Sequence, residues 1–107
     1  MIKLETLQRA KARTYIGFAI KSRTAIIGTD NILKCRRVNL LLIDETLSDN
    51  AKAKLMSKHQ DTNRCITIDN LGELTSLEGC KALAILNHNL AMAILKCADA
   101  HFEGDVN

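Results

Sequence analysis

The run VNLLLI, from Val38 to Ile43, decides the fold of this chain of 107 residues. Apart from Asn39 the run is apolar, and polar segments lie on both sides of it. A continuous apolar run of this length is typical of a strand that is buried on both faces of its sheet. The run therefore predicts an α/β fold in which helices cover both faces of a central sheet.

Outward from this run, helical and strand-like patterns alternate along the chain with short connections between them. The sequence predicts helices over residues 3–22, 29–37, 49–59, 71–76 and 89–100, and strands over residues 24–27, 38–43, 64–68 and 81–86. This alternation predicts an α/β sandwich with a mostly parallel central sheet. Residues 1–107 are expected to form one domain, with residues 103–107 as a frayed tail.

Apolar positions within the predicted helices indicate which side chains face the core. The expected inward residues are Leu4, Leu7, Ile16, Phe18, Ala19 and Ile20 in the first helix, Leu55 and Met56 in the third, and Leu90, Ala93, Ile94 and Cys97 in the last.

The four cysteines contain no Cys-x-x-Cys pair, and Cys35 and Cys65 stand in apolar or strand-like surroundings. The polar start of the chain does not resemble a secretory signal, so we expect reduced, mostly buried thiols in a cytoplasmic protein. No apolar run approaches the ~20 residues of a membrane span.

Charge is distributed unevenly along the sequence. Residues 1–37 contain nine lysines and arginines against two acids, a net charge of +7, whereas residues 38–107 contain six and ten. A solvated helix face rich in Lys and Arg would give the same pattern. A basic region beside a helix N-terminus also suits a phosphate-bearing partner, which makes RNA the first partner to test. Because the only aromatic residues are Tyr15, Phe18 and Phe102, a surface that binds single-stranded bases mainly by stacking is not expected.

The sequence lacks the usual patterns of a metal site or a catalytic nucleophile. His59, His88 and His101 are scattered, and none stands at ligand spacing from a cysteine. The glycines lie too far apart for a phosphate-cradling loop, and there is no Gly-x-Ser-x-Gly motif. Asp44 and Glu45 follow the apolar run, where ligands often bind, but a polar turn before the next helix explains them more simply. We expect a non-catalytic protein with no metal and no cofactor.

One segment, from Gly28 to Lys34, combines several features that suit nucleic acid. Gly28 permits a tight strand-to-helix turn and the close approach of a ligand. The first helical turn offers free N–H groups, and Asp30 and Asn31 add an acceptor and an amide that can contact purine edges. Lys34, Arg36 and Arg37 can hold the phosphate backbone. A capped helix start with a favourable acid would have the same sequence pattern.

These residues resemble a family of RNA-binding ribosomal proteins, the one that contains the large-subunit proteins seven-Ae and thirty-e, and especially its small bacterial members. GTDNILK, residues 28–34, is similar to the family's Gly-Thr-Asn-Glu-x-x-Lys motif, with Asp30 and Asn31 in place of its Asn-Glu pair. LGELTSLEG, residues 71–79, resembles the family's Leu-Gly-x-x-x-Gly-apolar-Glu-apolar loop, in which Leu77 and Glu78 match and Ser76 replaces a glycine. The similarity runs in the same order through about residues 14–97.

The resemblance implies a three-layer α/β/α sandwich with a four-stranded, mostly parallel (mixed) sheet. It also implies non-catalytic binding of structured, kink-turn-like RNA, with the ribosome as one place of action. We expect a monomer. The implied RNA-binding residues are Gly28, Thr29, Asp30, Asn31, Lys34 and Arg37 in the first segment and Thr75, Ser76, Leu77 and Glu78 in the second.

Two alternatives stay open. The chain could be a protein-interaction module on the same fold with an eroded RNA site, its basic face binding an acidic partner. It could also be an accessory domain that presents RNA to an enzyme.

Overall fold

The computed structural model describes residues 6–59, 65–77 and 79–99. The elements follow in the order α1 (Thr6–Lys21), β1 (Ala25–Ile27), α2 (Thr29–Lys34), β2 (Leu40–Asp44), α3 (Asp49–Lys58), β3 (Cys65–Ile68), α4 (Leu71–Thr75), β4 (Ala82–Ile85) and α5 (His88–Asp99). The four strands form one sheet in the order β1-β4-β2-β3. β4 pairs antiparallel with β1 and β2, and β2 pairs parallel with β3, so β1, β2 and β3 run in one direction.

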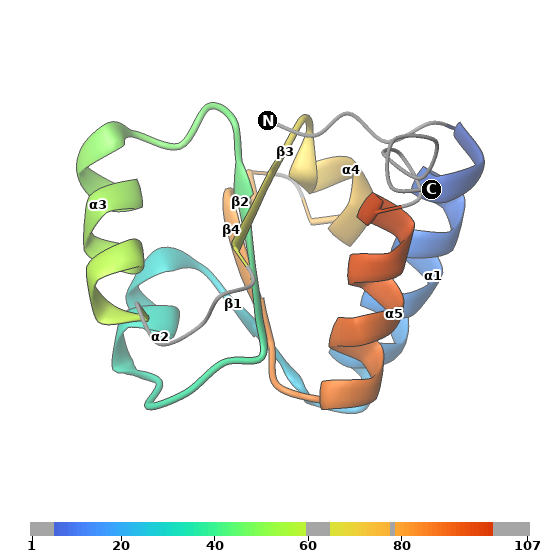
Figure 1. Ribbon diagram of the computed structural model, residues 1–107. Coiled ribbons are helices and arrows are strands. Elements are labelled where there is room, and N and C mark those ends of the chain that lie inside the picture. Colours follow the sequence, from blue (N-terminus) through green and yellow to red (C-terminus); the bar gives the residue numbers. More distant parts are fainter. Residues whose placement is uncertain (1–5, 60–64, 78, 100–107) are drawn as a thin grey trace.

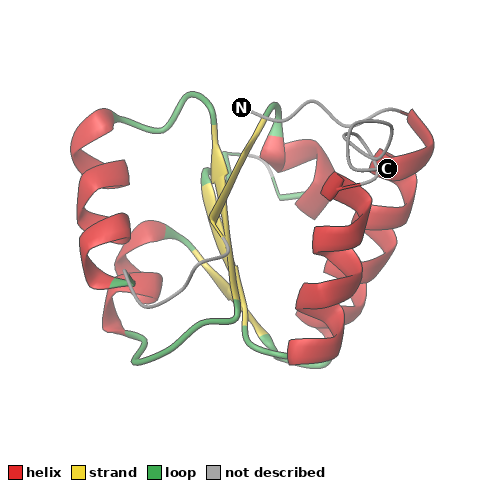
Figure 2. Cartoon of the chain, in the orientation of Figure 1, coloured by secondary structure: helices red, strands yellow, loops and turns green. Residues whose placement is uncertain are grey.

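Helices cover both faces of the sheet, which gives the molecule three layers (Figures 1 and 2). α2 and α3 lie on one face, and α1, α4 and α5 lie on the other (Figure 1). The predicted α/β/α sandwich with a four-stranded mixed sheet is therefore confirmed, but two of the three strand pairings are antiparallel, so the pairing is not mostly parallel as predicted. No helix in the described ranges is long and apolar enough to cross a membrane.

The predicted double burial of the central apolar run is also confirmed. Every residue of β2 is buried. Leu40 and Leu42 pack with the α1–α5 layer, whereas Leu41 and Ile43 pack with the α2–α3 layer. Because side chains alternate along a strand, one run of apolar residues serves two cores.

Two boundaries of this region differ from the prediction. β2 begins at Leu40 rather than Val38, and α2 ends at Lys34 rather than Arg37. Cys35 adopts an extended conformation, and its N–H closes the last turn of α2 on the carbonyl oxygen of Ile32 at 3.1 Å. The other elements begin and end within two residues of their predicted limits, except the predicted start of the first helix at residue 3. That start and the predicted tail lie outside the described residues.

Three predicted core positions are wrong. Phe18 is 54% exposed and Met56 is 47% exposed, and Cys65 is exposed at the start of β3. Ala12, Ile16 and Ala19 form the buried stripe of α1 at helical spacing. Phe18 lies off this stripe, and Met56 lies off the face of α3 that buries Leu55. Their hydrophobic character alone therefore wrongly predicted that they are buried.

The other expected inward side chains that the structure describes are buried or half-buried. Ile16, Ala19, Leu55, Ile94 and Cys97 are buried, as predicted. Ile20, Leu90 and Ala93 are half-buried. Of the remaining cysteines, Cys80 is buried and Cys35 is half-buried. Leu4 lies outside the described residues, and so does the side chain of Leu7.

β2 ends in a buried carboxylate that ties three elements together. Asp44 Oδ1 accepts a hydrogen bond from the N–H of Leu71, the first residue of α4, at 2.8 Å. Asp44 Oδ2 accepts from the N–H of Thr46 at 2.9 Å and from the Thr46 hydroxyl, and Lys81 Nζ before β4 lies 4.0 Å away. Burial alone would raise the pKa of Asp44, but these hydrogen bonds and the charge of Lys81 lower it below its ordinary value of 3.8.

Replacing this carboxylate should loosen the end of the sheet. We expect Asp44→Asn to lower the free energy of unfolding at pH 7 by about 2 kcal/mol, because hydrogen bonds to a charged acceptor are lost. The folded-state pKa of Asp44 is lowered, so its contribution is present above pH 3.8 and disappears as the pH falls through the folded value. Urea unfolding should therefore show a large difference in the free energy of unfolding between Asp44→Asn and wild type at pH 7, and this difference should shrink at acidic pH.

Asp49→Asn is the matched control, because Asp49 is an exposed acid in the first turn of α3. It should cost about 0.3–1 kcal/mol through the helix dipole alone. An Asp44→Asn variant as stable as wild type at pH 7 would contradict the anchoring role.

Candidate nucleic-acid interface

The turn from β1 into α2 depends on a glycine. Gly28 has φ 93° and ψ 145°, a combination that side chains with a Cβ rarely adopt. Its N–H donates to the carbonyl oxygen of Ala82 at 3.0 Å, and its own carbonyl accepts from Ile32 N–H at 3.1 Å. The predicted tight turn is therefore present, and it is attached directly to the first residue of β4.

α2 presents most of the predicted polar residues to solvent. Its apolar anchor is Ile32, which is fully buried, whereas Asp30, Asn31 and Lys34 are exposed and Thr29 is half-buried. Gly28 supplies no side-chain cap. Asn31 Nδ2 donates to the carbonyl oxygen of Ile27 at 2.9 Å, so this amide also stabilises the turn.

Arg37 is exposed in the connection that follows α2 rather than on the helix itself. It belongs to a different surface from Asn31, since α2 carries the chain back across the sheet from the end of β1 to the start of β2.

The second predicted segment is a sharply turned loop after α4. Ser76 has φ 59° and Gly79 has φ 80°, so the chain turns twice through the left-handed region. Leu77 is 38% exposed at the loop. Glu78, which the sequence placed in the interface, lies outside the described residues.

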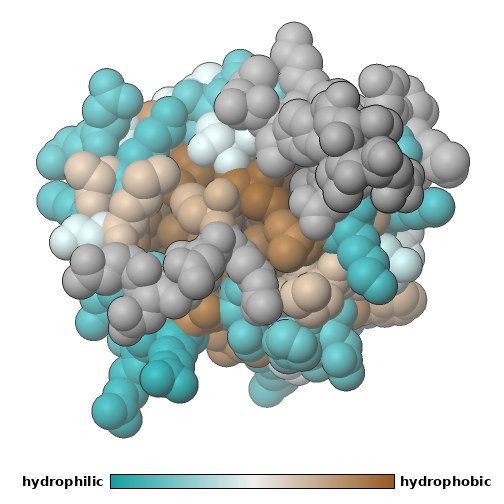
Figure 3. Space-filling model, viewed as in Figure 1, coloured by the Kyte–Doolittle hydropathy of each residue, from teal (hydrophilic) through white to brown (hydrophobic). Residues whose placement is uncertain are grey.

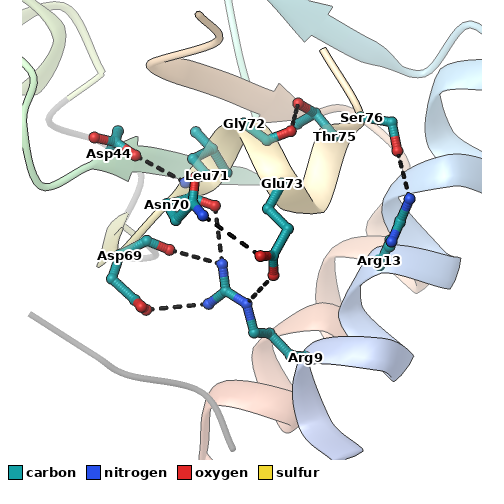
Figure 4. Close-up of polar contacts among 10 residues, drawn as sticks. All are labelled: Arg9, Arg13, Asp44, Asp69, Asn70, Leu71, Gly72, Glu73, Thr75 and Ser76. Carbon is teal, nitrogen blue, oxygen red and sulfur yellow. Dashed lines mark hydrogen bonds and ion pairs between the residues drawn. The ribbon is translucent and has the colours of Figure 1, made fainter. Parts of the chain in front are cut away.

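Thr75 is placed inside the molecule rather than on its surface. It is 6% exposed, and its hydroxyl donates to the carbonyl oxygen of Gly72 at 3.1 Å and accepts from Leu77 N–H at 3.1 Å. Its hydroxyl is used within the loop, so its part in any interface is to set the loop's shape (Figure 4).

Two arginines of α1 hold α4 and its loop, a role that the sequence did not reveal. Arg9 contacts Asp69 and Glu73 with Nη1 to Oδ1 at 3.1 Å and Nε to Oε1 at 2.6 Å. Arg9 Nη2 also donates to the carbonyl oxygens of Asp69 and Asn70, at 3.0 Å and 2.9 Å (Figure 4). Hydrogen bonding and charge from Arg9 lower the pKa of Glu73 below its ordinary value. Arg13 Nη2 donates to Ser76 Oγ at 3.0 Å.

Sheet topology brings the two predicted segments to the same region. β1 and β4 pair antiparallel with Ile27 opposite Leu83, so β1 ends where β4 begins. Gly28 therefore lies beside Ala82 and the loop that enters β4. Lys81 stands exposed at this junction. The sequence pattern predicts Lys81 only as the first residue of a strand and does not indicate that it belongs to the candidate interface.

The polar residues at the end of β2 are organised as a turn. Asp44 is committed to Thr46 and Leu71, and the chain continues to Ser48, whose hydroxyl accepts from Ala51 N–H at 3.2 Å and begins α3. A polar cleft of about 310 Å³ lies between this turn, α4 and Lys81. Within the described residues, no group of three or more His, Cys, Asp or Glu side chains is placed to hold a metal ion.

Comparisons with known proteins find the fold in solved structures. No protein-family profile matches the sequence, and a search of curated protein sequences finds no match. The structure is similar to a protein of unknown function from Bacillus halodurans, with a TM-score of 0.72, 16% identity, and coverage of 84% of this chain and 98% of that one. It is also similar to the 15.5 kD RNA-binding protein of Giardia lamblia, with a TM-score of 0.64, 14% identity, and coverage of 91% and 92%. At these identities the likeness shows that the chain shares the fold of these two proteins.

Proposed function

We propose that this protein binds structured RNA of the kink-turn type and carries out no catalysis. The observation that carries the proposal is the hydrogen bond between Gly28 N–H and the Ala82 carbonyl oxygen, which holds the start of α2 beside the loop after α4. Two segments that resemble an RNA-binding pattern, separated in sequence by residues 35–70, are thus brought to the same edge. A fold neighbour that is an RNA-binding protein supports the same conclusion.

The chemistry of this edge suits base recognition. Asn31 offers an amide and Asp30 an acceptor, both exposed, and both can pair with donors on purine edges. Leu77 adds an exposed apolar contact for a base. Lys34 supplies a cation one helical turn from Asn31, in position for a phosphate. A cytoplasmic, ribosome-associated role is also part of the proposal.

Specific RNA binding should distinguish a bent RNA from a straight one. We expect the protein to bind a kink-turn duplex more tightly than a fully paired duplex of the same length. The logarithm of affinity should fall linearly with the logarithm of salt concentration for both RNAs. Fluorescence anisotropy at two salt concentrations measures both effects. Equal, weak binding to the two duplexes would leave only non-specific electrostatic attraction and would overturn the kink-turn proposal.

Single substitutions in α2 should separate base contacts from backbone contacts. We expect Asn31→Ala to erase the preference for the kinked RNA, because a base contact is lost, and Lys34→Ala to weaken all RNAs alike. Asn50→Ala is the control for the first variant, since Asn50 is an exposed asparagine on α3.

Asn31 also bonds Ile27, so thermal unfolding must confirm that the Asn31→Ala variant is folded. If both α2 variants bind like wild type, the interface lies elsewhere on the molecule.

A further inference from the structure

The connections at one end of the sheet carry basic side chains, and most carboxylates near the sheet lie at its other end. Three connections meet at the end of the sheet where β1 and β2 begin and β4 finishes: residues 22–24, 35–39 and 86–87. Backbone hydrogen bonds join them, from Leu86 N–H to the Thr24 carbonyl at 2.7 Å and from Asn39 N–H to the Ile85 carbonyl at 2.8 Å. The Asn39 side-chain amide also donates to the Leu86 carbonyl oxygen. The three connections therefore form one continuous surface.

This surface, which we call the basic end, carries only positive charge. It consists of Lys21 and Arg23 around the first connection and Lys34, Arg36 and Arg37 around the second, all of them exposed. None of the five forms an ion pair or a side-chain hydrogen bond with any residue in the described part of the chain. The three connections contain no carboxylate. Hydrophilic side chains project from this part of the molecule at the lower edge of Figure 3.

The opposite end of the sheet carries the carboxylates. There β1, β2 and β3 finish and α2, α3 and α4 begin, and the carboxylates close to these element ends are Asp30, Asp44, Glu45, Asp49, Asp69 and Glu73. Arg9 is neutralised there by Asp69 and Glu73, and Lys81 lies 4.0 Å from Asp44. Arg9 and Lys81 thus lie beside carboxylates, whereas, among the residues that the structure describes, the five cations of the basic end do not.

We propose that the basic end is the surface on which the phosphate backbone of a bound RNA stem lies. This inference rests on the proposed function. α2 has six residues and spans roughly 9 Å from Gly28 to the basic end. An RNA that contacts Asn31 with its bases is thus directed along α2 toward Arg36 and Arg37. Phosphates are attracted to the five unpaired cations of the basic end, so the stem extends along α2 in that direction.

The experiment compares three RNAs by fluorescence anisotropy over a series of salt concentrations. One is a kink-turn duplex in which both stems are a full helical turn long. In each of the other two, one stem is trimmed to half a turn and closed by a stable tetraloop. The protein variant is Arg36→Gln with Arg37→Gln. The control is Lys11→Gln with Lys96→Gln, which removes the same charge from the cleft between α1 and α5.

The variant should bind the full-length RNA about 10-fold more weakly, with a salt slope smaller by about two, because two phosphate contacts are lost. Its preference for kinked over fully paired RNA should remain. Trimming one particular stem should abolish the difference between variant and wild type, and trimming the other stem should preserve it. The control should bind all three RNAs like wild type.

The possible failures are distinguishable. If the Arg36 and Arg37 variant binds every RNA like wild type while wild type still prefers the kink, the basic end is not an RNA surface and the proposed function stands. If wild type binds no RNA, both proposals fall. If wild type binds poly-glutamate and the Arg36 and Arg37 variant does not, while the variant binds RNA like wild type, the basic end is a surface for an acidic protein and the proposal is overturned.

Discussion

The structure depends on the burial of β2 and β4 on both faces of the sheet. Every residue of these two central strands is buried, so helices must cover each face and charged groups are left to the outer helix surfaces and to the two ends of the sheet. Because β1 and β2 run in the same direction, α2 must carry the chain back across the sheet between them. That return requires the sharp turn at Gly28 and delivers the basic residues after α2 to the end opposite the carboxylates. The geometry of the candidate interface is thus a consequence of a buried sheet.

Local patterns in the sequence were sufficient to predict the helices and strands but not the burial of every side chain. The buried central strand and the start of a helix at residue 49 were correctly predicted, since each has a short-range physical signal. The end of α2 was misjudged because residues 35–37 have no strong helix breaker, and only the pairing of Asn39 with Ile85 shows that the chain is already entering the sheet. Phe18 and Met56 were misplaced for a related reason: an apolar residue beside a buried stripe is indistinguishable from one within it until the neighbouring layer is known.

The candidate interface contains features that no local pattern could have revealed. Arg9 contacts Asp69, Asn70 and Glu73, all at least sixty positions away in sequence, and Thr75 is buried because its hydroxyl closes its own loop. Part of the +7 net charge of residues 1–37 is therefore not available to a partner, because Arg9 is paired with two carboxylates beside α4. Among the sequence-predicted interface residues that the structure describes, which exclude Glu78, some are exposed and others shape a turn or loop. Gly28 and Thr75 belong to the second kind.

Asp30 and Asn31 stand where the RNA-binding motif that this segment resembles has an Asn-Glu pair, and the proposed arrangement accounts for this difference. A carboxylate near phosphates weakens RNA binding unless it accepts a hydrogen bond from a base. In the proposed arrangement the phosphates of the stem are drawn to Arg36 and Arg37, beyond the far end of α2, whereas Asp30 stands in its first turn. Asp30 is therefore directed to base donors. Asn31 presents its side-chain amide at the same edge, and its Nδ2 also donates a hydrogen bond to the carbonyl oxygen of Ile27. In the proposed arrangement, the basic end holds the phosphates of the stem away from Asp30.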